Sequence, residues 1–332
     1  MSDTVKLQDA ANGRAPAPSR QILALGVIAV LAALLPLVAS DYQLRFVAEI
    51  LIVGAAVLSL DLLVGYGGLV SLGHATLFGG AAYAAAVASR SLGADLTLMV
   101  GIGTLTGMVM AFITGIVVMR TIALFFLILT LIVGQIFWEI AFHWRDVTGG
   151  ADGMRGLPTL SLNLGVTKLD LSSSFALYVT AAVLAFAAWA VARSFVNAPI
   201  GRALIGTRER QLRMSALGYD IARIRMMALL ASGAIAGAAG SLYPFVNQYI
   251  GPNSMQWTFS AMMVVMLVIG GVGSLYGAFI GTAVYLGIQT YISSYTDRWQ
   301  LVVGLIFVLT VMIMPRGIVH GVGSLFGGKG KQ

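Results

Sequence analysis

The chain has 332 residues, of which 58% are hydrophobic and only 10% are charged, and its mean hydropathy is +0.91. A water-soluble protein of this size needs a charged shell, because apolar surface exposed to water is unfavourable in proportion to its area. The composition therefore excludes a soluble domain and predicts an integral membrane protein. There is no cysteine, and the three histidines are far apart in the sequence, which excludes disulfides, thiolate chemistry and the usual zinc spacings.

Apolar runs long enough, or nearly so, to cross a hydrocarbon core of roughly 30 Å predict an all-α transmembrane bundle with about ten spans. They lie at Ile22–Ala39, Phe46–Val64, Leu69–Ala88, Thr97–Met119, Ile122–Phe142, Phe175–Ala192, Met226–Tyr243, Thr258–Val272, Tyr276–Ile292 and Gln300–Met314. Because Gly270–Gly273 can break a helix, residues 258–292 form either two spans or one bent helix. The predicted organisation is an N-terminal tail at 1–21, a transmembrane domain at 22–314 and a C-terminal tail at 315–332.

The basic residues predict the orientation, because cytoplasmic loops of membrane proteins carry an excess of Lys and Arg. With the N-terminus inside, 14 basic residues lie on the inner side and 6 on the outer side. Both termini are therefore expected in the cytoplasm, with residues 143–174 as the longest outer loop. The net charge of +7 follows from this membrane topology and does not indicate nucleic-acid binding.

Small residues and sparse carboxylates characterise the predicted spans. Glycines recur four apart at 273, 277 and 281 and at 233 and 237, a spacing that favours close helix packing in lipid over a direct ligand role. Glu49, Asp61 and Glu139 lie near the ends of their spans, whereas proton- or sodium-coupled carriers usually need carboxylates deep in the bundle. This pattern argues against transport powered by the chain itself.

Residues 193–225 form the longest inner connection. It carries seven arginines together with spaced apolar residues, and Asn197-Ala198-Pro199 and Gly218 provide a helix start and a helix stop. The pattern predicts short amphipathic helices at the membrane surface. They either anchor the chain to lipid headgroups or dock into a groove on another protein.

The stretch Leu63–His74 carries four glycines, at 65, 67, 68 and 73, between two predicted spans at the inner face. Such a density breaks helices and exposes backbone groups that can line a polar path. The candidate path residues are Gly65, Tyr66, Gly67, Ser71 and His74. The alternative is a tight inner turn whose Ser and His side chains hydrogen-bond to neighbouring helices.

A glycine-rich stretch opens the outer loop. Its candidate residues are Thr148, Gly149, Gly150, Asp152 and Gly153, with Asp146 and Arg155 as further charges beside it. Glycine permits positive φ angles and Asp152 can accept from backbone N–H groups, so a compact loop is predicted. It either meets another protein on the outer side, or forms part of the path entrance, or is a self-contained turn.

No catalytic or metal site is predicted. Gly323–Lys329 matches the spacing of a phosphate-binding loop up to its lysine, but Gly330 stands where Ser or Thr would hold Mg²⁺. The chain also lacks a His-carboxylate cluster and the usual hydrolase motifs. An ATP-driven mechanism would therefore need a separate ATPase.

Four stretches resemble the permease subunits of branched-chain amino-acid ABC importers of the LivM type. They are Leu63–His74, Trp144–Gly153, Gly201–Tyr219 and Gly270–Gly277, in the family's order over about residues 45–320. The resemblance implies a helical permease of the LivM or BtuC-like type that is not an enzyme. It also implies that residues 193–225 contact the ATPase, through Gly201, Arg202, Arg208, Glu209, Ala216, Leu217 and Gly218.

The same resemblance implies the substrate and the partners. The substrates would be leucine, isoleucine and valine, and the partners would be a second, LivH-like permease, two LivG/LivF-like subunits that hold ATP and Mg²⁺, and a periplasmic binding protein. Membrane lipid is also expected around the chain, and nucleic acid is not. The alternatives are a permease for urea, amides, other amino acids or aromatic acids, an autonomous carrier or channel, or a non-transporting membrane scaffold.

Overall fold

The computed structural model describes residues 39–119, 121, 123–163, 168–296, 298–313 and 317–318. The chain divides into two compact units, Met1–Leu44 and Arg45–Gln332, and only residues 39–44 of the first unit are described. The predicted span at Ile22–Ala39 and the two predicted tails therefore lie almost entirely outside the described residues.

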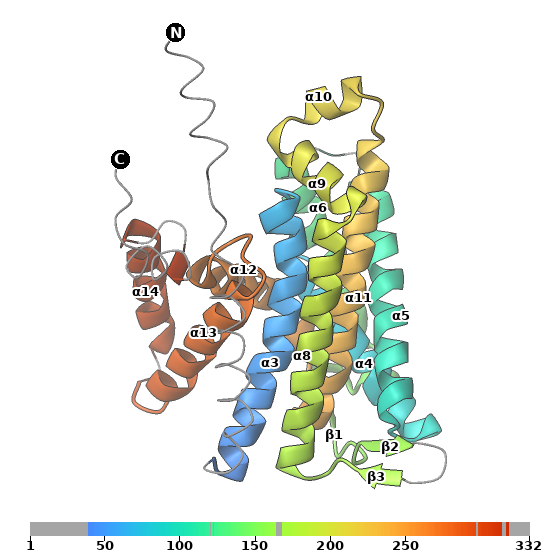
Figure 1. Ribbon diagram of the computed structural model, residues 1–332. Helices are drawn as coiled ribbons and strands as arrows, with labels where there is room; N and C mark the ends of the chain where they lie inside the picture. The colour runs from blue at the N-terminus through green and yellow to red at the C-terminus, as the bar shows by residue number, and fades with distance from the viewer. Residues whose placement is uncertain are drawn as a thin grey trace, which may run out of the picture. The chain divides into compact units, whose positions relative to one another are not determined.

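The described part of the chain is built from helices, which confirms the all-helical prediction (Figure 1). The longer helices are α3 (Asp41–Asp61), α4 (His74–Leu92), α5 (Leu96–Val118), α6 (Ala123–His143), α8 (Ser174–Asn197), α9 (Pro199–Glu209), α11 (Ile221–Asn247), α12 (Trp257–Gly270), α13 (Gly277–Ser293) and α14 (Trp299–Ile313). The shorter ones are η1 (Leu62–Tyr66), α7 (Arg145–Thr148), η2 (Gly150–Asp152), α10 (Gln211–Ala216) and η3 (Pro252–Met255). Strand β1 (Met154–Arg155) pairs antiparallel with β4 (Tyr249–Ile250), and β2 (Ser161–Asn163) pairs antiparallel with β3 (Lys168–Asp170).

Five helices of the described chain are long and apolar enough to cross a membrane, and they fall on five of the predicted spans. They are Asp41–Tyr66, Leu96–Val118, Leu124–His143, Ser174–Asn197 and Ile221–Asn247. Four further predicted spans are occupied by α4, α12, α13 and α14, which have 19, 14, 17 and 15 residues. Helix α4 begins five residues later than expected, because the chain from Gly67 to Gly73 is not helical.

Residues 258–292 form two helices rather than one bent helix. Helices α12 and α13 are separated by residues 271–276, and their backbones touch on both sides of this loop. A methyl group on Gly281 would overlap the Met266 carbonyl oxygen, and one on Gly270 would overlap the Gly277 carbonyl. Glycine is therefore required on this helix face, as predicted for Gly277 and Gly281.

Gly273 does not belong to that helix face. It lies in the loop between the two helices with a φ of 80°, a conformation that suits glycine. The four-residue spacing in the sequence predicted a packing role for Gly273, but the helix starts only at Gly277.

Helices α4, α5 and α11 pack side by side in the second unit. Helices α5 and α11 approach closely where Gly103 and Gly107 face Gly233 and Gly237, because none of the four has a side chain to separate the backbones. This arrangement bears out the packing role predicted for Gly233 and Gly237.

We predict that Gly107→Ala destabilises the protein by about 1–3 kcal/mol, because the added methyl group would overlap the Gly233 carbonyl oxygen and force the two helices apart. Gly101→Ala in the same helix is the matched control, since nothing lies within 4 Å of its methyl position. Thermal unfolding of the purified protein in lipid nanodiscs measures both changes. A fall in melting temperature for Gly101→Ala as large as that for Gly107→Ala would contradict this packing.

Candidate functional site

Helices α9 and α10 lie together at one end of the bundle, where the chain turns back from α8 into α11 (Figure 1). Pro199 occupies the first turn of α9, where a missing N–H costs nothing, and Gly218 follows α10 with a φ of 85°. These two residues are the start and stop signals found in the sequence. The prediction of short helices in this segment is therefore confirmed.

Helix α9 is attached firmly to the spans. Its Gly201 leaves no room for a side chain against the carbonyl oxygens of Phe195 and Val196, and its Leu204 and Thr207 are buried. The tight turn from α8 into α9 follows from this contact. Helix α9 is therefore packed directly against the end of α8.

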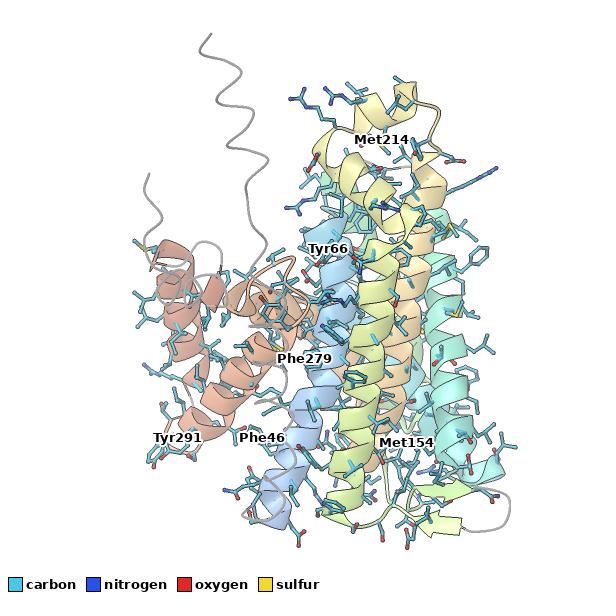
Figure 2. All side chains as sticks on the ribbon, in the orientation of Figure 1. Phe46, Tyr66, Met154, Met214, Phe279 and Tyr291 are labelled. Atoms are coloured by element: carbon cyan, nitrogen blue, oxygen red, sulfur yellow. The ribbon has the colours of Figure 1, made fainter. Side chains whose placement is uncertain are left out.

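Helix α10 has no buried residue, although it carries apolar side chains. Leu212 is 88% exposed, and Leu217, which follows the helix, is 67% exposed, whereas Met214 is only partly exposed and lies between α10 and Gly206 of α9 (Figure 2). The buried Arg225 at the start of α11 holds the base of α10, because its Nη2 donates to Gln211 Oε1 at 3.0 Å and its Nη1 donates to the Thr121 carbonyl at 3.3 Å. A short helix that exposes apolar side chains and is held at its base is suited to docking onto another protein.

The predicted coupling residues take two kinds of position. Gly201 is buried at the turn into α9. The other six residues are exposed, namely Arg202, Arg208, Glu209, Ala216, Leu217 and Gly218. Arg208 also points back to the spans. Its Nη1 donates to the Gly65 carbonyl, and its aliphatic stem covers Gly68.

A network that we call the Asp61 junction joins three distant parts of the chain next to Arg208. It comprises Asp61, Gly65, Tyr66, Arg208, Gly273 and Leu275. The fully buried carboxylate of Asp61 accepts from the Gly273 N–H at 2.7 Å and from the Leu275 N–H at 3.2 Å. The Tyr66 hydroxyl donates to the Gly273 carbonyl at 2.9 Å.

The π-helical turn η1 gives the junction its geometry. It widens the end of α3 over Leu62–Tyr66, which brings Tyr66 to the loop between α12 and α13 (Figure 2). Gly65 lies between the loop and Asp61, and a side chain there would overlap the Asp61 carboxylate. The junction therefore requires the glycine at position 65.

The other candidate path residues follow η1, with Gly67 and Ser71 in the non-helical segment and His74 at the start of α4. Gly67 packs against Leu204 of α9, and Ser71 is buried. His74 is also fully buried, and its Nε2 lies 2.7 Å from the Ser59 hydroxyl, which itself donates to the Ala56 carbonyl. Ser71 and His74 thus lie among neighbouring helices. The alternative of a tight inner turn expects them in this position.

The outer loop folds at the opposite end of the bundle. The Thr148 hydroxyl lies 2.6 Å from the Ala141 carbonyl oxygen and 2.7 Å from the Trp144 carbonyl oxygen, which share its one proton, and it accepts from the Gly150 N–H at 3.2 Å. Gly149, Gly150 and Gly153 have φ angles of 76°, 61° and 68°. The glycines therefore allow the chain to turn tightly, as predicted.

This loop is also tied to a segment a hundred residues away. Strand β1 pairs with β4, and Gly153 lies against the Ile250 carbonyl, while the Asp152 side chain is exposed. The Arg155 guanidinium lies 5.3 Å from the centre of the Tyr249 ring. The loop is thus supported by the chain after α11 and is not a self-contained turn.

Asp95 fixes the loop at a second point. Its carboxylate accepts from the Thr97 hydroxyl and from the N–H groups of Thr97, Leu98 and Asn163. These bonds, with the Thr97 side chain as the largest contribution, hold the pKa of Asp95 below its usual range. A carboxylate with a lowered pKa stabilises the fold above its unfolded pKa, so at neutral pH Asp95 contributes its full effect.

We predict that Gly153→Ala loosens the outer loop, because a methyl group would overlap the Ile250 carbonyl in addition to straining the positive φ. Gly156→Ala is the matched control, with a φ of 66° and nothing within 4 Å of its methyl position. Limited proteolysis of residues 143–174 should be faster in Gly153→Ala by several-fold. Equal cleavage rates in the two variants would contradict a role for the contact with Ile250, because both substitutions strain a positive φ and only Gly153→Ala adds the overlap.

The structure brings together three of the four stretches singled out in the sequence. Leu63–His74, Gly201–Tyr219 and Gly270–Gly277 meet at the Asp61 junction, while Trp144–Gly153 lies at the other end. The sequence reasoning missed the role of Asp61, which it treated as one peripheral carboxylate among three. The available signal was an acidic residue at the end of an apolar span, just before the glycine-rich break.

The described residues define a multi-pass helical membrane protein with a structured loop at one end and an exposed basic helical pair at the other. Within that part of the chain, no group of three or more His, Cys, Asp or Glu side chains could hold a metal ion.

The comparisons with known proteins identify the family. The chain belongs to the family described as "Branched-chain amino acid transport system / permease component", whose sequence pattern matches residues 42–313. It is therefore a LivM-like permease subunit of the ABC importer class and not an enzyme. No solved structure matches the chain.

Individual relatives carry the same description. The chain is 24% identical to the high-affinity branched-chain amino acid transport system permease protein LivM of Salmonella typhimurium, over 90% of this chain and 75% of that protein. It is 25% identical to LivM of Escherichia coli K12 over the same shares. LivH of Escherichia coli K12 is 29% identical over 51% of this chain and 57% of that protein.

Proposed function

We propose that this chain is one of two permease subunits of an ATP-driven importer for leucine, isoleucine and valine in a bacterial inner membrane. The second permease is a LivH-like chain, ATP and Mg²⁺ bind to two separate ATPase subunits, and a periplasmic binding protein delivers the substrate. Family membership and the names of the LivM and LivH relatives support the substrate and the permease pair.

The observation that carries the mechanism is the exposed helix α10 on its fixed base. The apolar side chains of Leu212 in α10 and of Leu217 just after it stand among Arg210 and Arg213, which gives a surface that a groove of an ATPase subunit can bury. A lipid-headgroup anchor would also use arginines. However, helix α9 links α10 to the Asp61 junction through Arg208, and a passive anchor has no use for this connection.

The orientation follows from the same assignment. If α9 and α10 face the ATPase, their end of the bundle is cytoplasmic, and the outer loop with Thr148, Gly149, Gly150, Asp152 and Gly153 faces the periplasm. The 14 against 6 distribution of basic residues supports this orientation, in which both termini are inside. The exposed Asp152 and Arg155 are then available to a binding protein.

Transport by proteoliposomes distinguishes this proposal from an autonomous carrier. With both permeases, the ATPases and the binding protein, leucine uptake should require ATP, and this chain alone should take up none. Uptake of leucine by this chain alone would contradict the proposal, and urea or amide uptake by the full complex in preference to leucine would correct the substrate.

We predict that Leu212→Ala weakens binding of the ATPase subunits about tenfold, because docking would remove the 88% exposed side chain from water. Leu105→Ala in α5, where the leucine is 64% exposed on a spanning helix, is the matched control and should leave the affinity unchanged. Titration of ATPase subunits onto permease pairs in nanodiscs measures both. If both variants bind as tightly as the parent, α10 acts as a membrane anchor instead.

A further inference from the structure

The Asp61 junction connects the proposed docking segment to helices α12 and α13. Arg208 of α9 donates to the Gly65 carbonyl in η1. On its other side, Gly65 lies against the loop between α12 and α13, and a methyl group there would be only 2.7 Å from the Gly273 nitrogen. The Asp61 carboxylate lies close to Gly65 as well.

The loop cannot move independently of its helices. The backbones of α12 and α13 touch at Gly270 and Gly277 and again at Met266 and Gly281, so the two helices and residues 271–276 form one hairpin. Closely packed backbones transmit a displacement rather than yield to it. Whatever moves the Gly273–Leu275 backbone therefore moves the whole α12–α13 hairpin.

Asp61 is what holds the loop to the end of α3. Its two oxygens bind two N–H groups of the loop, at Gly273 and Leu275, and the Arg208 guanidinium lies within electrostatic reach of the same carboxylate. A buried carboxylate is costly unless it is hydrogen-bonded, and Asp61 accepts from two N–H groups that an apolar side chain would leave without a partner. Simple packing therefore does not explain the charge.

We propose that Asp61 is the positioning residue through which a movement of α9 reaches the α12–α13 hairpin. The inference rests on the proposed function, in which the ATPase subunits displace α9. Asp61 keeps the loop against Gly65, so that a displacement of Arg208 shifts the loop with it. Without the carboxylate bonds the loop loses this contact, and ATP hydrolysis no longer drives the hairpin.

The test is the number of leucine molecules transported per ATP hydrolysed by the complete complex in proteoliposomes. In Asp61→Asn the amide oxygen still accepts from one N–H, but the NH₂ group opposes the other, so one of the two bonds is lost. We expect ATP hydrolysis to stay within about twofold of the parent while leucine per ATP falls about tenfold, as the loss of a hydrogen bond to a charged group implies.

Glu49→Gln is the matched control. It removes a carboxylate of the same helix whose hydrogen-bond partner is Asn247, far from the junction, and it should leave leucine per ATP unchanged. A purely structural role for Asp61 predicts instead that assembled complex, hydrolysis and transport fall together at a constant ratio. A constant ratio in Asp61→Asn would overturn the inference.

Two further variants keep the test decisive. Tyr66→Phe removes the hydroxyl that donates to the Gly273 carbonyl and buries no new polar group, so it serves if Asp61→Asn does not assemble, and it should lower leucine per ATP two- to threefold. An unchanged number of leucine molecules per ATP in Tyr66→Phe would overturn the inference too.

The second variant combines Arg208→Gln with Asp61→Asn. Its leucine per ATP should be no lower than that of the more severe single variant, because both residues act through the same contact. Independent effects that multiply would contradict the inference.

The outcome also separates this inference from the proposed function. If the parent complex takes up no leucine with ATP, the proposed function fails. If the parent complex transports leucine and Asp61→Asn retains the parent's ratio, only the role of Asp61 fails.

Discussion

The structure depends on one constraint, which is that a buried backbone N–H group inside a membrane protein must find its partner within the protein. Two helices are interrupted at the α9 end of the bundle, one after Tyr66 and one between Gly270 and Gly277. The second interruption presents the Gly273 and Leu275 N–H groups to the first, and the Asp61 carboxylate accepts from both. The two breaks thus stabilise each other.

The bonds from Asp61 to the Gly273 and Leu275 N–H groups explain why glycine-rich stretches far apart in the sequence meet at one place. Gly65 leaves room for the loop, and Gly273 adopts a φ that other residues rarely adopt. Arg208 then reaches the same point from α9, so the exposed α9–α10 segment and the α12–α13 hairpin share one contact. A permease driven from outside its spans needs such a connection between its docking surface and its helices.

Much of the fold could be predicted from the sequence, because lipid imposes long apolar runs that are visible without tertiary information. Pro199 and Gly218 likewise marked the short helices, since both act through local backbone geometry. The Asp61 junction could not be predicted in this way. Asp61 and Gly273 are 212 positions apart, and no local pattern indicates that a particular carboxylate will accept from a particular loop. The regular spacing of Gly273 with Gly277 even pointed to a helix face, because spacing does not show where a helix begins.

The most direct test of the account is a distance measurement between spin labels during the ATP cycle, for which the chain is suited because it contains no cysteine. One label would be introduced by Arg202→Cys in α9, a second by Tyr276→Cys in the α12–α13 loop, and a reference by Leu105→Cys in α5. On ATP binding to the assembled complex, the account predicts that the distance from 202 to 105 changes while the distance from 202 to 276 stays constant. A change in the distance from 202 to 276 would show that α9 moves without the hairpin, and would contradict the account.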